Sequence, residues 1–182
     1  MARGKRSIQK EANKLKIFIV IIVVIAILSF FFYKVIGHPP NKSLDGYSIY
    51  EAANYTICYK SDWTSAIADD NPNMIVFSST DNLGIINVIT EDLTTKYTLD
   101  EYVDASIYNI KSILNLTDGD IGKEKVSING VKAYRISYIA SEITRIVQTI
   151  FLSDSTAYIV SFNSAIDYFD VYYNMEKTLV MK

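Results

Sequence analysis

The sequence predicts an α+β domain, an antiparallel sheet flanked by helices, preceded by one transmembrane helix. Three observations lead to this fold class: an apolar run near the start, a series of β-rich segments separated by short turns, and two amphipathic helical segments. Strands joined by short turns pair antiparallel, and an amphipathic helix needs an apolar surface to cover. An α+β fold satisfies both requirements.

The apolar run is the first element of the chain. Seventeen uncharged residues, 17–33, lie between Lys16 and Lys34. Because Lys34 can extend its ammonium group toward the lipid headgroups, residues 17–36 reach about the 30 Å of a hydrocarbon core. We therefore expect an uncleaved transmembrane anchor at 17–36.

Other kinds of apolar segment fit this run less well. A cleaved signal peptide has a shorter apolar core and a small-residue cleavage site, neither of which is present here. A lipoprotein signal needs a cysteine directly after the run, whereas the single cysteine is Cys58. A buried globular helix would carry a polar face. A cleaved signal remains the main alternative.

The charges are distributed unevenly along the chain. Residues 1–16 contain six Lys or Arg and one Glu, whereas the chain from Val35 onward contains 11 basic and 19 acidic residues. The basic head predicts a cytoplasmic tail and an extracellular C-terminal domain, attached to the cell membrane of a bacterium by a single pass. An acidic body argues against nucleic-acid binding. The expected organisation is a tail at 1–16, the anchor at 17–36, a linker at 37–46 and one extracytoplasmic domain at 47–182.

The first half of the domain contains three clear strand signals. Apolar residues alternate with polar ones in 55–59, and segments 74–79 and 85–90 are rich in β-branched residues. Residues 81–84 (DNLG) have the composition of a hairpin loop. We therefore expect the second and third strands to form a hairpin.

A helix is predicted over residues 98–114. Thr98 and Glu101 have the spacing of a capping box, in which each side chain bonds the other's backbone N–H. The apolar residues recur at helical spacing and should cover the sheet: Leu99, Tyr102, Val103, Ile107, Ile110 and Leu114.

Four strands and a final helix complete the predicted domain. Asn129-Gly130 is a strong hairpin signal, because both residues tolerate the positive φ of a type I′ turn, and Asp154-Ser155 marks a second turn. Ser164 is the expected cap of the last helix. The strands are expected at 123–128, 131–139, 145–153 and 156–163, and the apolar positions of the helix include Tyr168, Val171, Tyr172, Met175 and Leu179.

Several short phrases accompany this order of elements: Tyr55–Tyr59 with Trp63, Asn87-Val88, Asp100–Val103, Ile128–Gly130 with Ala133–Arg135, Arg145–Gln148 and Ala157–Val160. Together they resemble the PsbP / DcrB family of α/β/α-sandwich domains. The resemblance spans roughly 47–180, and it implies a scaffold that binds other proteins. Many bacterial members resemble lipid-anchored envelope proteins, so a transmembrane anchor is a departure. So is the ending Thr178–Lys182, where the family has a Ser-Phe pair.

Candidates for catalysis are few. The sole histidine, His38, lies beside two prolines in the linker, and one histidine with one cysteine cannot supply a zinc site. We expect Cys58 to be a half-buried strand residue, with pairing to another chain as the alternative. No glycine-rich phosphate loop is present. The sequence therefore predicts a protein that is not an enzyme and has no required cofactor.

Paired carboxylates leave one weak metal candidate. Asp69-Asp70, Glu91-Asp92 and Asp118-Gly119-Asp120 all fall in predicted loops. Asp118 and Asp120 could converge on a weak Ca²⁺ site, because Gly119 allows a tight turn, but they lack the bidentate Glu of an EF-hand. Solvated turn residues are the ordinary interpretation of all three pairs.

Tyrosine is unusually frequent, with 14 residues in the chain. Most should pack in the core, but tyrosine is also enriched where proteins bind one another. We expect a partner-binding surface around Tyr108, Tyr168, Tyr172 and Tyr173. The favoured hypothesis is a binding or assembly module that contacts an unknown envelope protein. The alternatives are a weak cation or small-ligand sensor, or a hydrolase that uses the loop carboxylates.

Overall fold

The structure is a computed structural model that describes residues 41–44, 46–81, 83–141, 144–164 and 168–182. The predicted tail and anchor lie outside these residues, as does His38. Within the described ranges, no helix combines the length and hydropathy needed to cross a membrane.

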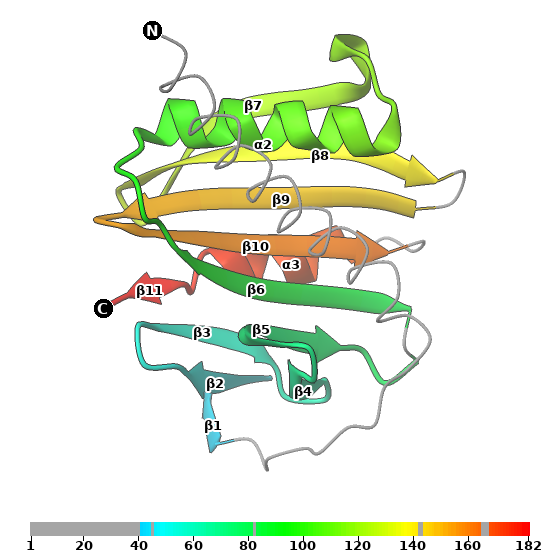
Figure 1. Cartoon of the computed structure of the whole chain (residues 1–182). Helices are drawn as coiled ribbons and strands as arrows, with labels where there is room; N and C mark the ends of the chain where they lie inside the picture. Colours follow the sequence, from blue (N-terminus) through cyan, green and yellow to red (C-terminus); the bar gives the residue numbers. More distant parts are fainter. Residues whose placement is uncertain (1–40, 45, 82, 142–143, 165–167) are drawn as a thin grey trace, which may run out of the picture.

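The described strands form two antiparallel sheets (Figure 1). The smaller has the order β1-β2-β3-β11, and the larger has the order β4-β5-β6-β10-β9-β8-β7. The smaller sheet contains β1 (Asn41–Leu44), β2 (Tyr47–Glu51), β3 (Tyr55–Lys60) and β11 (Val180–Met181). The larger contains β4 (Thr64–Ala68), β5 (Asn71–Ser78), β6 (Gly84–Asp92), β7 (Ile121–Ile128), β8 (Val131–Ser141), β9 (Thr144–Ser153) and β10 (Thr156–Ser164).

The strand order explains the position of the long helix. After β6, the chain must reach the far edge of the larger sheet to start β7, and α2 (Leu99–Leu114) makes this crossing over one face. The strands β7 to β10 then return hairpin by hairpin until β10 pairs with β6. The short helix α3 (Phe169–Glu176) lies on the opposite face (Figure 1).

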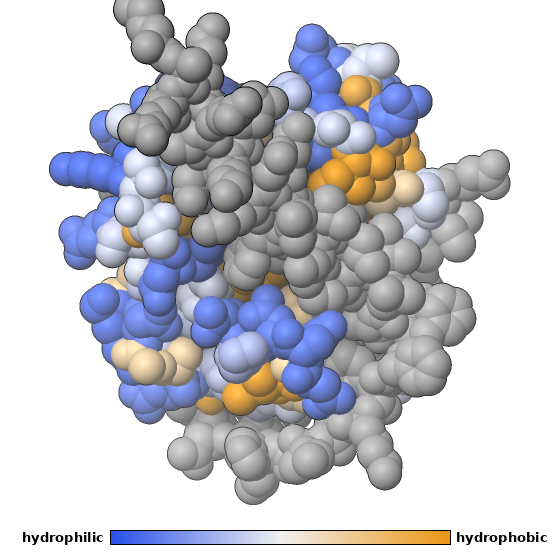
Figure 2. Space-filling model, viewed as in Figure 1, coloured by the Kyte–Doolittle hydropathy of each residue, from blue (hydrophilic) through white to orange (hydrophobic). Residues whose placement is uncertain are grey.

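Two hydrophobic cores lie on either side of the larger sheet. Alternation along β9 sends Ile146 and Ile150 into the core beneath α2, and Val147 and Phe151 into the core shared by α3 and the smaller sheet. Fully burying one such side chain contributes about 1.5–3 kcal/mol. On the α2 side, the described surface is mostly hydrophilic, with smaller hydrophobic areas (Figure 2).

Several local predictions are confirmed. Thr98 caps α2, and both hydrogen bonds of the capping box with Glu101 are present. The turn between β7 and β8 has φ values of 52° at Asn129 and 80° at Gly130. The hairpin between β5 and β6 forms as expected.

Other predictions are wrong. One antiparallel sheet was expected, and the described strands form two. Part of the predicted linker forms β1, and the short strands β2 and β4 were not predicted. Ser164 does not cap the last helix, because it continues β10 and pairs with both Gly84 and Arg145. The helix therefore starts later, at Phe169, and the chain leaves it before Leu179 to form β11.

Candidate functional site

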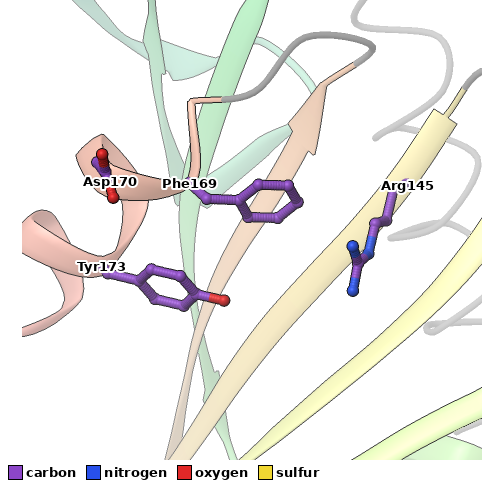
Figure 3. A pocket seen from close by; sticks show the side chains of 4 residues that line it. All are labelled: Arg145, Phe169, Asp170 and Tyr173. Carbon is purple, nitrogen blue, oxygen red and sulfur yellow. The ribbon is translucent and has the colours of Figure 1, made fainter.

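An open pocket of about 330 Å³ lies between α3 and the start of β9 (Figure 3). It is lined by Arg145, Phe169, Asp170 and Tyr173. Phe169 and Tyr173 are one helical turn apart, and their rings stack with centroids 6.2 Å apart and planes inclined by 25°. The guanidinium carbon of Arg145 lies 5.2 Å from the centroid of the Phe169 ring, a cation–π contact.

The two charged residues of the pocket are not paired with each other. Arg145 is exposed, and within the described residues it forms no ion pair. The carboxylate of Asp170 lies away from Arg145 in Figure 3. The pocket therefore presents a guanidinium group, beside two aromatic rings, that the described carboxylates leave uncompensated.

The ring of Tyr173 packs against an ionic network formed by Arg135, Glu176 and Glu124. The guanidinium carbon of Arg135 lies 4.7 Å from the centroid of the Tyr173 ring. Arg135 also donates a hydrogen bond to Glu176, which is fully buried, and lies 3.5 Å from a carboxylate oxygen of Glu124. Burial opposes the charge of Arg135, but Glu176 outweighs this effect and raises the pKa of the guanidinium group. Tyr173 is thus held against a cation that stays charged.

Tyr172 belongs to this network and not to the surface. Its side chain is 0% exposed, and its hydroxyl lies 2.6 Å from Oγ1 of Thr149 and donates to the Val160 carbonyl at 3.2 Å. Burial, followed by the nearby Glu176 carboxylate, raises the pKa of Tyr172 well above its usual value. The prediction that Tyr172 contacts a partner is wrong, because this side of α3 packs against the sheet.

Tyr168 is half-buried, and its hydroxyl is already engaged. It donates to Asp81 at 2.8 Å, and its ring meets Trp63 edge-on with centroids 5.7 Å apart. A Cβ added to Gly84 would lie 2.7 Å from the Tyr168 ring, so only glycine allows this approach. Hydrogen bonds from Ser79, the Leu83 N–H and Tyr168 lower the pKa of Asp81. Tyr168 therefore fastens α3 to the hairpin loop.

Tyr108 and Tyr173 lie on different faces. Tyr108 is 63% exposed on α2, across the larger sheet from α3. Tyr173 is half-buried in the pocket. The four tyrosines singled out in the sequence therefore do not form one surface.

Asp118 and Asp120 each bind within the protein. Asp118 forms an ion pair with Lys111. Asp120 accepts hydrogen bonds from the backbone N–H and hydroxyl of Thr117 at 2.6 and 2.7 Å, which lower the pKa of Asp120. Among the described residues, no three His, Cys, Asp or Glu side chains are grouped to hold a metal ion. The structure thus gives a Ca²⁺ site at these carboxylates no support.

Two other side chains that the sequence suggested as reactive, Cys58 and Glu91, are both buried. Cys58 is a buried strand residue. We expected Glu91 in a loop, but it lies near the end of β6. There it is buried and accepts a hydrogen bond from Tyr102 at 2.5 Å. Burial raises the pKa of Glu91, and this hydrogen bond offsets part of the rise.

Sequence comparisons find no relative of the chain. No protein-family model matches it, and no curated protein is significantly similar. Among solved structures, it is similar to cyanobacterial PsbP (CyanoP) from Synechocystis sp. PCC 6803, with a TM-score of 0.60 and 14% identity over 81% of this chain and 99% of that one. The chain has a PsbP-like fold.

A second solved structure, from Bacteroides thetaiotaomicron VPI-5482, matches 70% of this chain and 45% of its own, with a TM-score of 0.49 and 14% identity. At 14% identity to CyanoP, the comparison shows the fold and assigns no role to any pocket residue.

Three of the four pocket residues were missed in the sequence. Phe169 and Asp170 stand in the predicted helix without a distinguishing pattern, and Arg145 begins a strand as an ordinary polar residue. One signal was available. Phe169 and Tyr173 have the i, i+4 spacing at which aromatic rings meet on a helix.

Proposed function

We propose that this PsbP-like domain is a non-catalytic binding module of the bacterial cell envelope, tethered by residues 17–36 and contacting a protein partner outside the membrane. The observation that carries the proposal is the open pocket, where Arg145 lies beside the stacked rings of Phe169 and Tyr173. Arginine and tyrosine are among the residues that contribute most to binding energy at protein interfaces.

The surface beside the pocket supports this proposal. Ile139 is 63% exposed, and it pairs with Arg145 across β8 and β9, so both side chains project from the same face of the sheet. An exposed aliphatic side chain next to two aromatic rings and a cation that no described carboxylate pairs with is a mixed surface of the kind that protein partners cover.

The carboxylates favour binding over hydrolysis. Asp118 is paired with Lys111, Asp120 caps the short turn after Thr117, and Glu91 holds the hydroxyl of Tyr102. Each of these groups has a structural partner that a catalytic role would have to displace.

The tether and the outer location rest on the sequence. The apolar run at 17–36 is long enough to span a bilayer, and the six basic residues before it favour a cytoplasmic N-terminus. A tethered binding domain needs no strong affinity of its own, because confinement at the membrane raises its effective concentration near a membrane partner.

The test uses intact cells that express the full chain. External protease should degrade the domain, and a membrane-impermeant crosslinker should repeatedly capture the same identified envelope protein. Arg145→Glu should abolish this capture, whereas Lys132→Glu should preserve it. Lys132 is an exposed cation on β8 whose side chain points to the other face of the sheet. Protection from protease, or capture that Arg145→Glu leaves unchanged, would refute the proposal.

A further inference from the structure

Arg145 differs from Arg135, which lies on the adjacent strand β8. From Val35 onward, the chain has 19 acidic and 11 basic residues, so most cations have acidic side chains available. Arg135, which projects from the same face on β8, is paired with both Glu124 and Glu176. Among the described residues, Arg145 is paired with neither an Asp nor a Glu. Its guanidinium group is therefore available to an anion from outside, and it can bind a carboxylate through two parallel hydrogen bonds.

The aromatic wall of the pocket is already fixed. Phe169 packs edge-on against Phe162, with centroids 5.0 Å apart, and stacks on Tyr173. Arg135, on β8, contacts the Tyr173 ring through a cation–π interaction. Since these rings are ordered before any ligand arrives, a flat apolar group that packs on them loses little extra entropy from the protein side.

Asp170 limits the charge that the pocket accepts. It lines the same pocket as Arg145, is exposed, and belongs to no ion pair of the described side chains. Together with the acidic excess of the domain, it repels an anion that carries more than one charge. A phosphate group is therefore a poorer fit than a single carboxylate.

We infer that the pocket binds a segment of the partner protein in which one carboxylate lies next to an aromatic side chain. The carboxylate pairs with Arg145, and the aromatic ring packs on Phe169 and Tyr173. This inference rests on the proposed function and specifies the chemistry of the partner at this site.

Three small probes separate charge from aromatic contact. N-acetyl-phenylalanine carries one carboxylate beside one ring, N-acetyl-phenylalaninamide lacks only the charge, and N-acetyl-alanine lacks only the ring. Binding to the full chain in detergent micelles is measured by ligand-observed NMR titration. The acid should bind about tenfold more tightly than either comparison probe, since it alone makes both the charge-assisted hydrogen bonds and the ring contact.

Variants of Arg145 test the assignment of the charge. Arg145→Gln should remove the preference for the acid over the amide, Arg145→Lys should retain part of it, and the control Lys132→Gln should retain all of it. Equal binding of acid and amide by the unmodified chain would overturn the inference, as would a preference that survives in Arg145→Gln. If Arg145→Gln fails to fold, the comparison of acid and amide binding by the unmodified chain still tests whether the pocket prefers a carboxylate.

The two proposals fail in different ways. If cells yield a captured partner but the probes show no preference for the carboxylate, the inference about the pocket falls and the binding function stands. If the probes show the preference but the domain captures nothing at the cell surface, the proposed function falls instead.

Discussion

The carboxylate of Glu176, on the last turn of α3, is completely buried and accepts a hydrogen bond from the guanidinium group of Arg135 on β8. The second carboxylate oxygen accepts a hydrogen bond from Thr149 at 2.5 Å. A buried ion pair is weak evidence for stability, because desolvating two charges offsets much of their attraction. Here the pair also places Arg135 against Tyr173, so it links the core of the domain to the candidate binding pocket.

Removing the buried charge of this pair should destabilise the domain. Glu176→Leu leaves Arg135 without its buried partner, and we expect a loss of about 2–4 kcal/mol in the free energy of unfolding. This is less than the full cost of breaking a buried ion pair, because the Arg135 side chain is 19% exposed and water can solvate part of its charge. Urea unfolding of the full chain in detergent measures this loss. The double variant Arg135→Met/Glu176→Leu should recover part of it; a double variant that is less stable than the single one would contradict this account.

The hydroxyl of Tyr172 should also contribute to stability. Tyr172→Phe removes the hydrogen bonds to Thr149 and to the Val160 carbonyl, and we expect a loss of about 1–2 kcal/mol. Tyr108→Phe is the matched control, because that side chain is 63% exposed. Thermal unfolding followed by circular dichroism compares the two variants, and equal melting temperatures would argue against a structural role for the Tyr172 hydroxyl.

Glu91 should make stability depend on pH. Because burial raises the pKa of Glu91 above the value of 4.5 expected for an unfolded chain, the folded protein binds the proton more tightly than the unfolded one. Its contribution to stability is therefore largest below the unfolded pKa and declines as the pH rises through the folded pKa.

The amide variant Glu91→Gln cannot titrate at this position, but it can still bond with the Tyr102 hydroxyl. Its stability relative to the unmodified chain should increase between pH 4 and pH 8, values chosen to bracket the ordinary carboxyl range. Urea unfolding at a series of pH values measures the difference. A difference that is constant over this range would show that Glu91 does not titrate with folding.

Gly84 should not tolerate a side chain. In Gly84→Ala, the new Cβ would lie 2.7 Å from the Tyr168 ring and 3.1 Å from the Trp63 ring, and we expect overpacking to cost about 1–3 kcal/mol. Gly119→Ala provides the control, because its nearest contact would be 3.9 Å away. If both variants unfold at the same denaturant concentration, the contact between Tyr168 and the hairpin loop is looser than the structure indicates.

Local signals in the sequence predicted most of the secondary structure. The capping box of Thr98 and Glu101 and the turn at Asn129-Gly130 depend on neighbouring residues only, and both are confirmed. The start of α3 could not be predicted in this way. Ser164 is a good helix cap by itself, but its pairing with Gly84 and Arg145 extends β10 through it.

In the candidate site, too, local sequence signals predicted only part of what the structure shows. The sequence singled out Tyr173, because tyrosine is common at interfaces, but the same argument selected Tyr172, which is buried. Their opposite surroundings depend on how α3 sits on the sheet. Arg145 lies 28 positions before Tyr173 in the chain, so no local pattern connects them.

The sequence by itself determined the apolar segment, the charge difference between the head and the body, the α+β class and the principal turns, because hydrophobic periodicity and turn chemistry are local properties. Only the tertiary structure decided that strands pair into two sheets and that α3 carries Phe169 and Tyr173 to Arg145. The physical reason is that both outcomes depend on contacts between distant segments. The energy of such contacts comes from burial and pairing that neither segment has alone.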